Sequence, residues 1–160
     1  VKKMIKYLLM MMFCLSGCLI AVPAQIPPMD CALAIQGSNW SFLLPSDYFL
    51  MLSVDTPITV RTFVNRDDTT LVLFSKEPFR GSLDEFVKHR MNTPIEIKIS
   101  TAGESNDVRY VQTRGRTKDV WVSSYNLVKN GYGYSFMCES IHYEDLYWDC
   151  SQMFDTLRIE

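Results

Sequence analysis

The chain is poor in histidine, although its carboxylates are plentiful. It contains two histidines, His89 and His142, and neither lies in a catalytic motif. A hydrolase needs a nucleophile, a base and an orienting group, and no GxSxG segment is present. The glycines of "GYGYS", residues 131–135, lack the spacing of a phosphate-binding loop. These shortages predict a protein that is not an enzyme.

Metal ligands are equally scarce. His142 lies between Cys138 and Cys150, which is the only suggestive grouping in the sequence. Structural zinc sites use four ligands at recognisable spacings, whereas these three residues are irregularly spaced. We therefore predict neither a metal nor a cofactor.

An excess of positive charge is also missing. Lys and Arg number 16 against 18 Asp and Glu, and binding to nucleic acid requires clustered positive charge. We predict no nucleic-acid partner. Arg114, Arg116 and Lys118 gather in "RGRTK". We interpret this cluster as a solvated hairpin tip, with a contact to an anion or lipid head group as the alternative.

The N-terminal segment has a positive leader followed by a short apolar run. Lys2, Lys3 and Lys6 precede the continuously apolar residues 7–15, which is the pattern of a secretory signal. Only about 16 uncharged residues precede Pro23, whereas a membrane span needs roughly 20. A retained membrane anchor is thus the less favoured interpretation.

Leu15–Cys18, "LSGC", resembles the lipobox of bacterial lipoproteins. The resemblance implies that residues 1–17 are a signal peptide and that Cys18 carries a diacylglycerol on its sulfur. Leu19 stands where the family's inner-membrane sorting pattern has aspartate, which implies an outer-membrane anchor facing the periplasm. Ordinary cleavage after residues 22–24, "VPA", would instead give a soluble secreted protein.

The rest of the chain divides into a tether and one domain. Residues 18–38 contain three prolines and no clear period, and we expect an extended tether there. Residues 39–160 fit a single domain. Removal of residues 1–17 leaves 13 basic against 18 acidic residues, a net charge near −5. We therefore expect the lipid, and not surface charge, to hold the protein at a membrane.

Three of the five cysteines remain for the domain, because Cys14 leaves with the leader and Cys18 carries lipid. An exported domain meets an oxidising environment. Cys138 lies in an expected strand and Cys150 on the apolar face of an expected helix, so we predict that they form a disulfide; two buried thiols are the alternative. Cys31 is expected to be a buried or idle thiol, or to form an intermolecular bond.

Alternating apolar residues and turn signals predict an antiparallel sheet. Ser82 and Glu85 form a capping box that begins a short helix, and Asn130-Gly131 predicts a tight hairpin. The final segment has an apolar face at helical spacing from Tyr143 to Leu157. Expected strands cover 39–45, 58–64, 69–75, 95–100, 107–114, 120–128 and 132–140, with helices at 82–91 and 143–157 and a turn containing Gly115.

This pattern predicts an α+β fold: an antiparallel β-sheet packed by a short mid-chain helix and a C-terminal amphipathic helix. "SFLLP", "SLDEFVKHRM" and "YGYSFMCES…FDTLRIE" resemble the PsbP-like fold, which includes DcrB-like envelope lipoproteins. The resemblance covers about residues 39–160. It implies a sheet between helices and a non-enzymatic accessory or binding role, and it carries no catalytic residues.

Tyr143, Tyr147 and Trp148 form a candidate partner surface, since Tyr and Trp dominate interface energetics. Lateral packing of Trp148 on a loop is the alternative. We predict a lipid-anchored envelope protein that binds another, unidentified envelope protein. Two alternatives remain open: an envelope enzyme acting on cell-wall or lipid substrates, and an inhibitor or immunity-type protein.

Overall fold

The computed structural model describes residues 32–90, 96–117, 119–143, 146 and 150–160, with the side chains of 96–99 excepted. Several predictions lie outside the described residues: the signal peptide and lipid site at Cys18, the tether up to Cys31, Lys118, Tyr147 and Trp148.

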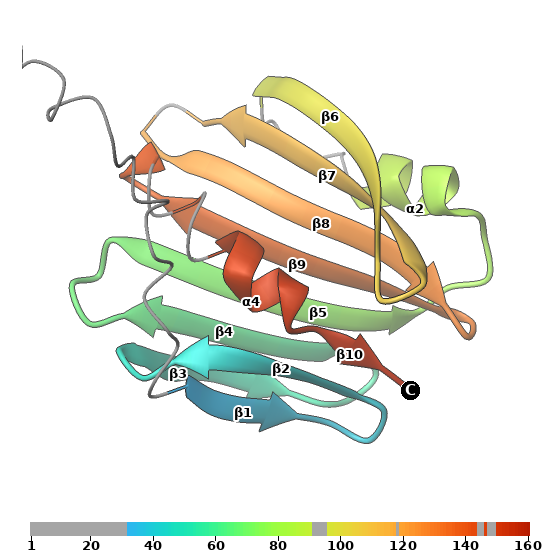
Figure 1. The fold of residues 1–160 in the computed structure, drawn as a ribbon, viewed down its shortest axis with the longest axis horizontal. Coiled ribbons are helices and arrows are strands. Elements are labelled where there is room, and N and C mark those ends of the chain that lie inside the picture. The colour runs from blue at the N-terminus through green and yellow to red at the C-terminus, as the bar shows by residue number, and fades with distance from the viewer. Residues whose placement is uncertain (1–31, 91–95, 118, 144–145, 147–149) are drawn as a thin grey trace, which may run out of the picture. The chain divides into compact units, whose positions relative to one another are not determined.

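The described chain forms two antiparallel sheets (Figure 1). The small sheet has three strands in the order β1 (Ala32–Gln36), β2 (Trp40–Pro45) and β10 (Arg158–Ile159). The large sheet has seven, in the order β3 (Tyr48–Val54), β4 (Thr59–Asn65), β5 (Thr70–Pro78), β9 (Tyr132–Ser140), β8 (Trp121–Lys129), β7 (Val108–Arg116) and β6 (Glu96–Ser105). The described chain also has two short helices, α2 (Leu83–Arg90) and α4 (Ser151–Asp155).

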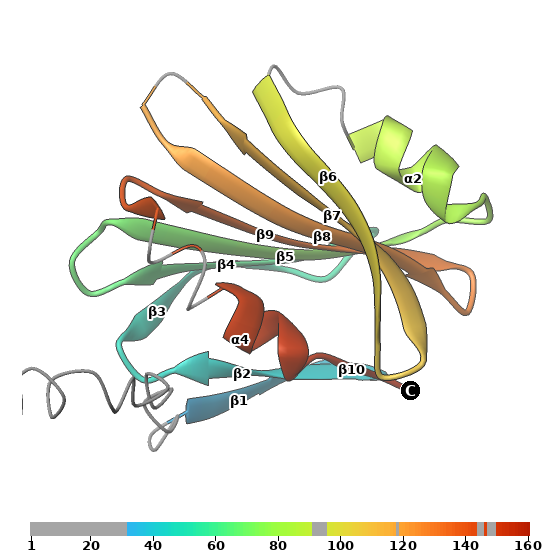
Figure 2. The ribbon, with the colours of Figure 1, turned by 45° about the horizontal axis from the view of Figure 1, so that its top comes forward.

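The large sheet has an inner and an outer face. Its inner face looks toward the small sheet, with α4 between the two sheets, and α2 lies on the opposite, outer side (Figure 2). Side chains alternate between the faces along each strand. Val72 and Phe74 of β5 are therefore buried on the inner face, while Leu73 and Ser75 belong to the outer face.

Aromatic side chains fill the space between the sheets. The Trp40 and Phe74 ring centroids lie 4.3 Å apart, and Phe42 meets Phe136 edge-on at 5.3 Å. Tyr125 stacks on Phe154 of α4 at 4.1 Å. Fully burying side chains of this kind contributes roughly 1.5–3 kcal/mol each, so this inner layer is the main source of stability.

Two predicted hairpins are confirmed. Asn130 and Gly131 have positive φ values of 53° and 78° and join β8 to β9. At the β4–β5 turn, Asn65 Oδ1 accepts hydrogen bonds from the backbone N–H groups of Thr69 and Thr70, each at 2.9 Å. Side-chain capping of a turn in this way is typical of Asn.

The predicted capping box is present at the start of α2. The Ser82 backbone N–H donates to Glu85 Oε2 at 2.7 Å, and the Glu85 N–H donates to Ser82 Oγ at 3.3 Å. The Ser82 hydroxyl also donates to Glu85 Oε2 at 2.9 Å. The hydrogen bonds that the carboxylate accepts from the Ser82 N–H and from this hydroxyl lower the pKa of Glu85 below its usual value of 4.5. Phe86 of α2 packs against Gly133 of β9, where any larger side chain would meet its ring.

The chain departs from the sequence prediction at its ends, at one turn and at residues 48–54, where no strand was expected and β3 forms. β1 begins at Ala32 and pairs with β2, so ordered structure starts before residue 39. Gly115 lies within β7, and the turn follows it, closed by the Thr117 N–H donating to the Val120 carbonyl.

The prediction of a helix over residues 143–157 is also wrong at its C-terminal end. Met153 and Phe154 are buried in α4, as the apolar period predicts, but α4 stops at Asp155. Arg158 and Ile159 then form β10 against β2. The described part of the chain is mostly β with two short helices, which agrees with the predicted α+β class in broad outline.

Candidate binding surface on the outer face

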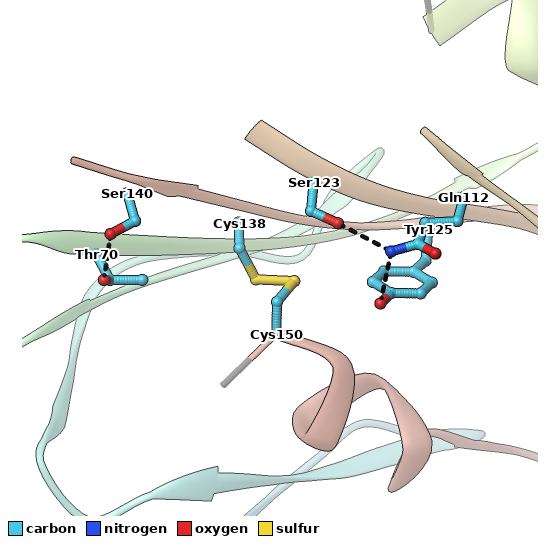
Figure 3. Close-up of a disulfide and its surroundings, with 7 residues drawn as sticks. All are labelled: Thr70, Gln112, Ser123, Tyr125, Cys138, Ser140 and Cys150. Carbon is cyan, nitrogen blue, oxygen red and sulfur yellow. Dashed lines mark hydrogen bonds between the residues drawn. A yellow bond between two sulfur atoms is a disulfide. The ribbon is translucent and has the colours of Figure 1, made fainter. Parts of the chain in front are cut away.

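The predicted disulfide joins Cys138 of β9 to Cys150 immediately before α4 (Figure 3). Their Cα atoms are 6.0 Å apart and both side chains are fully buried. The bond fastens the C-terminal segment to the centre of the inner face. Because both sulfurs are used in this bond, neither cysteine offers a thiolate to a metal ion.

Of the predicted partner surface, only Tyr143 lies among the described residues. It is 44% exposed and meets the Trp121 ring edge-on, with centroids 5.2 Å apart. Arg116 also contacts Trp121, with its guanidinium carbon 4.9 Å from the centroid of that ring. Tyr143 is thus accessible, but it is already engaged with β8.

The predicted basic cluster does not converge. The Arg114 guanidinium donates to the side-chain amide oxygen of Gln112, and the same amide hydrogen-bonds with the Tyr125 hydroxyl on the inner face. Arg116 instead stacks on Trp121. The pair therefore presents no shared anion site within the described residues.

The histidines also lie apart from each other. His142 is exposed, and its backbone N–H donates to Ser140 Oγ at 3.1 Å. His89, on the exposed side of α2, has its Nε2 3.9 Å from Glu77 Oε1. Within the described ranges, no three His, Cys, Asp or Glu side chains gather as metal ligands would. No helix in this part of the chain is long and apolar enough to cross a bilayer.

The most unusual surface is one that the sequence analysis did not single out. Among the described residues, six of the ten large apolar side chains that are exposed lie in residues 49–58. Phe49 is 51% exposed and Met51 is 62% exposed. β3 forms the edge of the large sheet, with β4 as its neighbour. A grouped apolar exposure of this kind usually marks an interaction site.

A bulge in β3 determines which of these side chains share a face. The register shifts between Leu50 and Leu52, so Met51 is the extra residue. Leu52 lies opposite Thr62, and Val54 lies opposite Val60. These positions alternate with the buried Phe63, so Leu52 and Val54 point to the outer face.

A groove lies on the outer face beside this edge. Its volume is about 430 Å³, within the range of small-molecule sites. The wall comes from the β3–β4 loop and from Arg90 at the end of α2, and the floor comes from β4, β5, β9, β8 and β7. Its lining residues are Val54, Thr56, Pro57, Ile58, Val60, Leu73, Ser75, Arg90, Thr113, Arg114, Gly115, Val122, Ser124, Asn126, Ser135 and Met137.

The groove floor has a polar row and a partly apolar row. Cross-strand pairing places Ser75, Ser135 and Asn126 side by side on β5, β9 and β8. The next row along the strands joins Leu73 to Met137, which are its apolar part, and continues into Ser124 on β8 and Thr113 on β7. Apolar side chains of the β3–β4 loop stand at the Val60 end of the floor. The groove is therefore amphipathic, with an apolar part that continues into the exposed residues of β3.

Arg90 is held over the polar row. Its Nη2 donates to Ser75 Oγ, and its Nη1 lies 4.0 Å from Glu77 Oε1. The hydroxyls of Thr113 and Ser124, which continue the Leu73–Met137 row, are 2.6 Å apart. Asn126 is buried in this lining, with Nδ2 donating to Ser124 Oγ and Oδ1 without a partner among the described residues.

Arg114 also contributes atoms to the groove wall, although its guanidinium bonds to Gln112. Arg90 is therefore the charged group that the groove presents over its polar floor. In the part of the chain that the structure describes, no acidic residue belongs to the lining. Sequence reasoning missed this site because its residues come from the half-buried positions of five strands, which carry no motif.

Comparison with known proteins gives a likeness of fold alone. No protein family and no curated protein matches this chain in sequence. The solution structure of cyanobacterial PsbP (CyanoP) from Synechocystis sp. PCC 6803 is similar, with a TM-score of 0.66 and 9% identity. That similarity covers 81% of this chain and 92% of the cyanobacterial one.

A crystal structure from Bacteroides thetaiotaomicron VPI-5482 is similar over 81% of this chain and 48% of its own, with a TM-score of 0.51 and 12% identity. This chain thus spans about half of that protein. Together the two structures support a PsbP-like fold, as the sequence pattern predicts.

Proposed function

We propose that this protein is an exported, lipid-anchored accessory module that binds another component of the bacterial envelope without catalysing a reaction. The observation that carries the proposal is the outer face of the large sheet. Its apolar edge at β3 and its groove form one continuous surface, joined by Val54 and Ile58.

The exposed apolar side chains of β3 are grouped closely enough to favour a surface that is covered by a binding partner. Leu52 is half exposed, and neighbouring Phe49 and Met51 are more so. Burying apolar area contributes about 25 cal/mol per Å², so covering several such side chains gives a substantial driving force for association. The remaining surface of the described chain has its exposed large apolar residues scattered singly or in pairs, which is ordinary for a soluble domain.

The lipid anchor supplies the location. The lipobox-like Leu15–Cys18 supports acylation of Cys18, and two or more acyl chains hold a protein firmly to a bilayer. Confinement beside the membrane raises the effective concentration of the domain near membrane-bound partners. A modest affinity at the outer face is then sufficient for lasting association.

Site-specific photocrosslinking in cells tests the binding role. A photoreactive residue replaces Leu52 on β3, and a matched variant replaces Leu33 on β1, which is 56% exposed on the small sheet. We expect a discrete adduct from position 52 and none from position 33. Equal labelling from both positions, or none from either, would overturn the proposal for the outer face.

Mass spectrometry of the N-terminal peptide tests the anchor separately. We expect acylated Cys18 as the first residue, and the Cys18→Ser variant should leave the membrane fraction. A native N-terminus at Gln25 without acyl groups would contradict the anchor while leaving the crosslinking result intact.

A further inference from the structure

We propose that the groove beneath Arg90 binds the acyl chain and acidic head group of a single-chain amphiphile. The inference rests on the proposed function, since it names the ligand class of the same outer face. The shared chemistry is an aliphatic tail ending in a carboxylate or a phosphate.

The apolar part of the groove fits an aliphatic tail. Leu73 and Met137 form the apolar part of the floor, and Val54 and Ile58 stand beside it as wall. A flexible methionine adapts its shape to irregular apolar ligands. Because Val54 and Ile58 are also exposed at the β3 edge, a tail longer than the groove continues over apolar surface.

The polar part fits an acidic head. Arg90 is fixed in place by Ser75 and Glu77, so it loses little side-chain freedom when it binds an anion. The hydroxyls of Ser75 and Ser135 lie in the row below it and can donate to the same oxygens. Glu77 offsets part of the charge, but it is not part of the lining.

The position of the polar row sets the orientation of the ligand. Val60 lies opposite Ser75 on the neighbouring strand, so the floor changes from apolar to polar within one strand spacing. An acidic head at Ser75 and a tail directed toward Ile58 satisfy both parts together. A cationic head would meet the Arg90 guanidinium, and a neutral head would leave that charge without a new partner.

Calorimetric titration of the purified full chain tests the proposal with four probes that share a dodecyl tail. These are dodecanoate, dodecyl phosphate, dodecanol and dodecyltrimethylammonium, each kept below its micelle concentration. We expect the two anions to bind about tenfold or more tightly than dodecanol, because hydrogen bonds to charged groups are the stronger ones, and the cation to bind weakest. Tighter binding of dodecanoate assigns the site to free fatty acids, and tighter binding of dodecyl phosphate assigns it to lipid phosphates.

Variants then locate the site. Arg90→Gln should remove the preference for anions and leave dodecanol affinity within about twofold, because a neutral head does not use the charge. Arg80→Gln, an exposed arginine outside the groove lining, should change nothing. Val60→Trp, which fills the floor between Ser75 and Ile58, should abolish binding of every probe. If Val60→Trp fails to fold, the Arg90→Gln selectivity decides the question alone.

Equal affinity for dodecanol and dodecanoate, or an unchanged anion preference in Arg90→Gln, overturns the ligand assignment. Its failure is distinguishable from failure of the proposed function. Crosslinks from position 52 without amphiphile binding retain the envelope partner and reject the ligand. Amphiphile binding without crosslinks from position 52 retains the ligand assignment and rejects the envelope partner.

Discussion

The two faces of the large sheet are built from the same strands but differ in burial. On the inner face, Phe74 and Tyr125 are buried beneath the small sheet and α4. On the outer face, the neighbouring positions Leu73 and Ser124 remain half exposed and line a groove. A side-chain alternation of two residues therefore separates the stabilising layer from the binding layer within each strand.

The difference extends to electrostatics. Burial raises the pKa of the Tyr125 phenol on the inner face to about 12. Arg90, at the outer groove, stays partly exposed beside Ser75. On the inner face the cations Arg61 and Lys76 lie against the rings of Trp40 and Tyr132, whereas Arg90 lies over hydroxyl groups at the groove.

Removing an inner aromatic should have the largest effect. Phe74→Ala deletes a fully buried ring that contacts Trp40 and Phe42. We expect a loss of about 3–5 kcal/mol in the free energy of unfolding, measured by urea denaturation. Leu52→Ala on the outer edge should stay within about 0.5 kcal/mol. Similar losses for both would contradict the division between the faces.

Removing the disulfide tests how the inner layer is closed. Cys150→Ser opens a loop whose ends are 12 residues apart, and we expect a loss of about 3 kcal/mol. Reducing the wild-type protein should reproduce the loss, measured in the same denaturation assay. Further reduction of the variant should do nothing; an unchanged stability in either experiment would show that the bond does not contribute.

Gly133 tests the contact that covers part of the outer face. A Cβ at this position would meet the Phe86 ring of α2. We expect Gly133→Ala to lower stability by about 1–3 kcal/mol through overpacking. The double variant with Phe86→Leu should recover part of this loss, as measured by a double-mutant cycle. If the changes in the free energy of unfolding of the two single variants simply add in the double variant, the residues at positions 133 and 86 do not interact.

The capping box gives the smallest effect, and it depends on pH. The pKa of Glu85 is lowered in the folded state, chiefly by its hydrogen bonds with Ser82. Its stabilisation is therefore full above 4.5, the ordinary value, and is lost as the pH falls through the lowered pKa. Glu85→Gln should be less stable than wild type near neutral pH, and the difference should vanish in acid.

Ser82→Ala is the control for this titration, because it removes the hydroxyl that donates to the carboxylate and keeps the backbone N–H of residue 82. In that background, Glu85→Gln should alter the pH dependence less than in wild type, and the part that remains reports the backbone hydrogen bond. A difference in stability between the wild type and the Glu85→Gln variant that persists at low pH would assign the effect to something other than the carboxylate.

Local signals in the sequence predicted much of the fold. The Asn130-Gly131 turn, the Ser82 capping box and the Cys138–Cys150 pair each depend on residues close together in the chain, and each is present. A feature that depends only on nearby residues has few alternative conformations, so its sequence pattern predicts it well. The periodic burial of Met153 and Phe154 was predicted for the same reason.

What the sequence did not predict depends on distant pairing. β10 forms because Arg158 and Ile159 pair with β2, which lies more than a hundred residues earlier in the chain. No local sequence pattern indicates this pairing. The run of residues 48–54 alternates poorly because Met51 is a bulge. The groove needs five strands in register before its rows of side chains meet, so it has no signature in the linear order.

The pairing of β10 with β2 also constrains when the protein can finish folding. The Glu160 N–H donates to the Asn39 carbonyl, and Ile159 lies opposite Trp40. The small sheet therefore stays incomplete during synthesis until residue 159 has emerged.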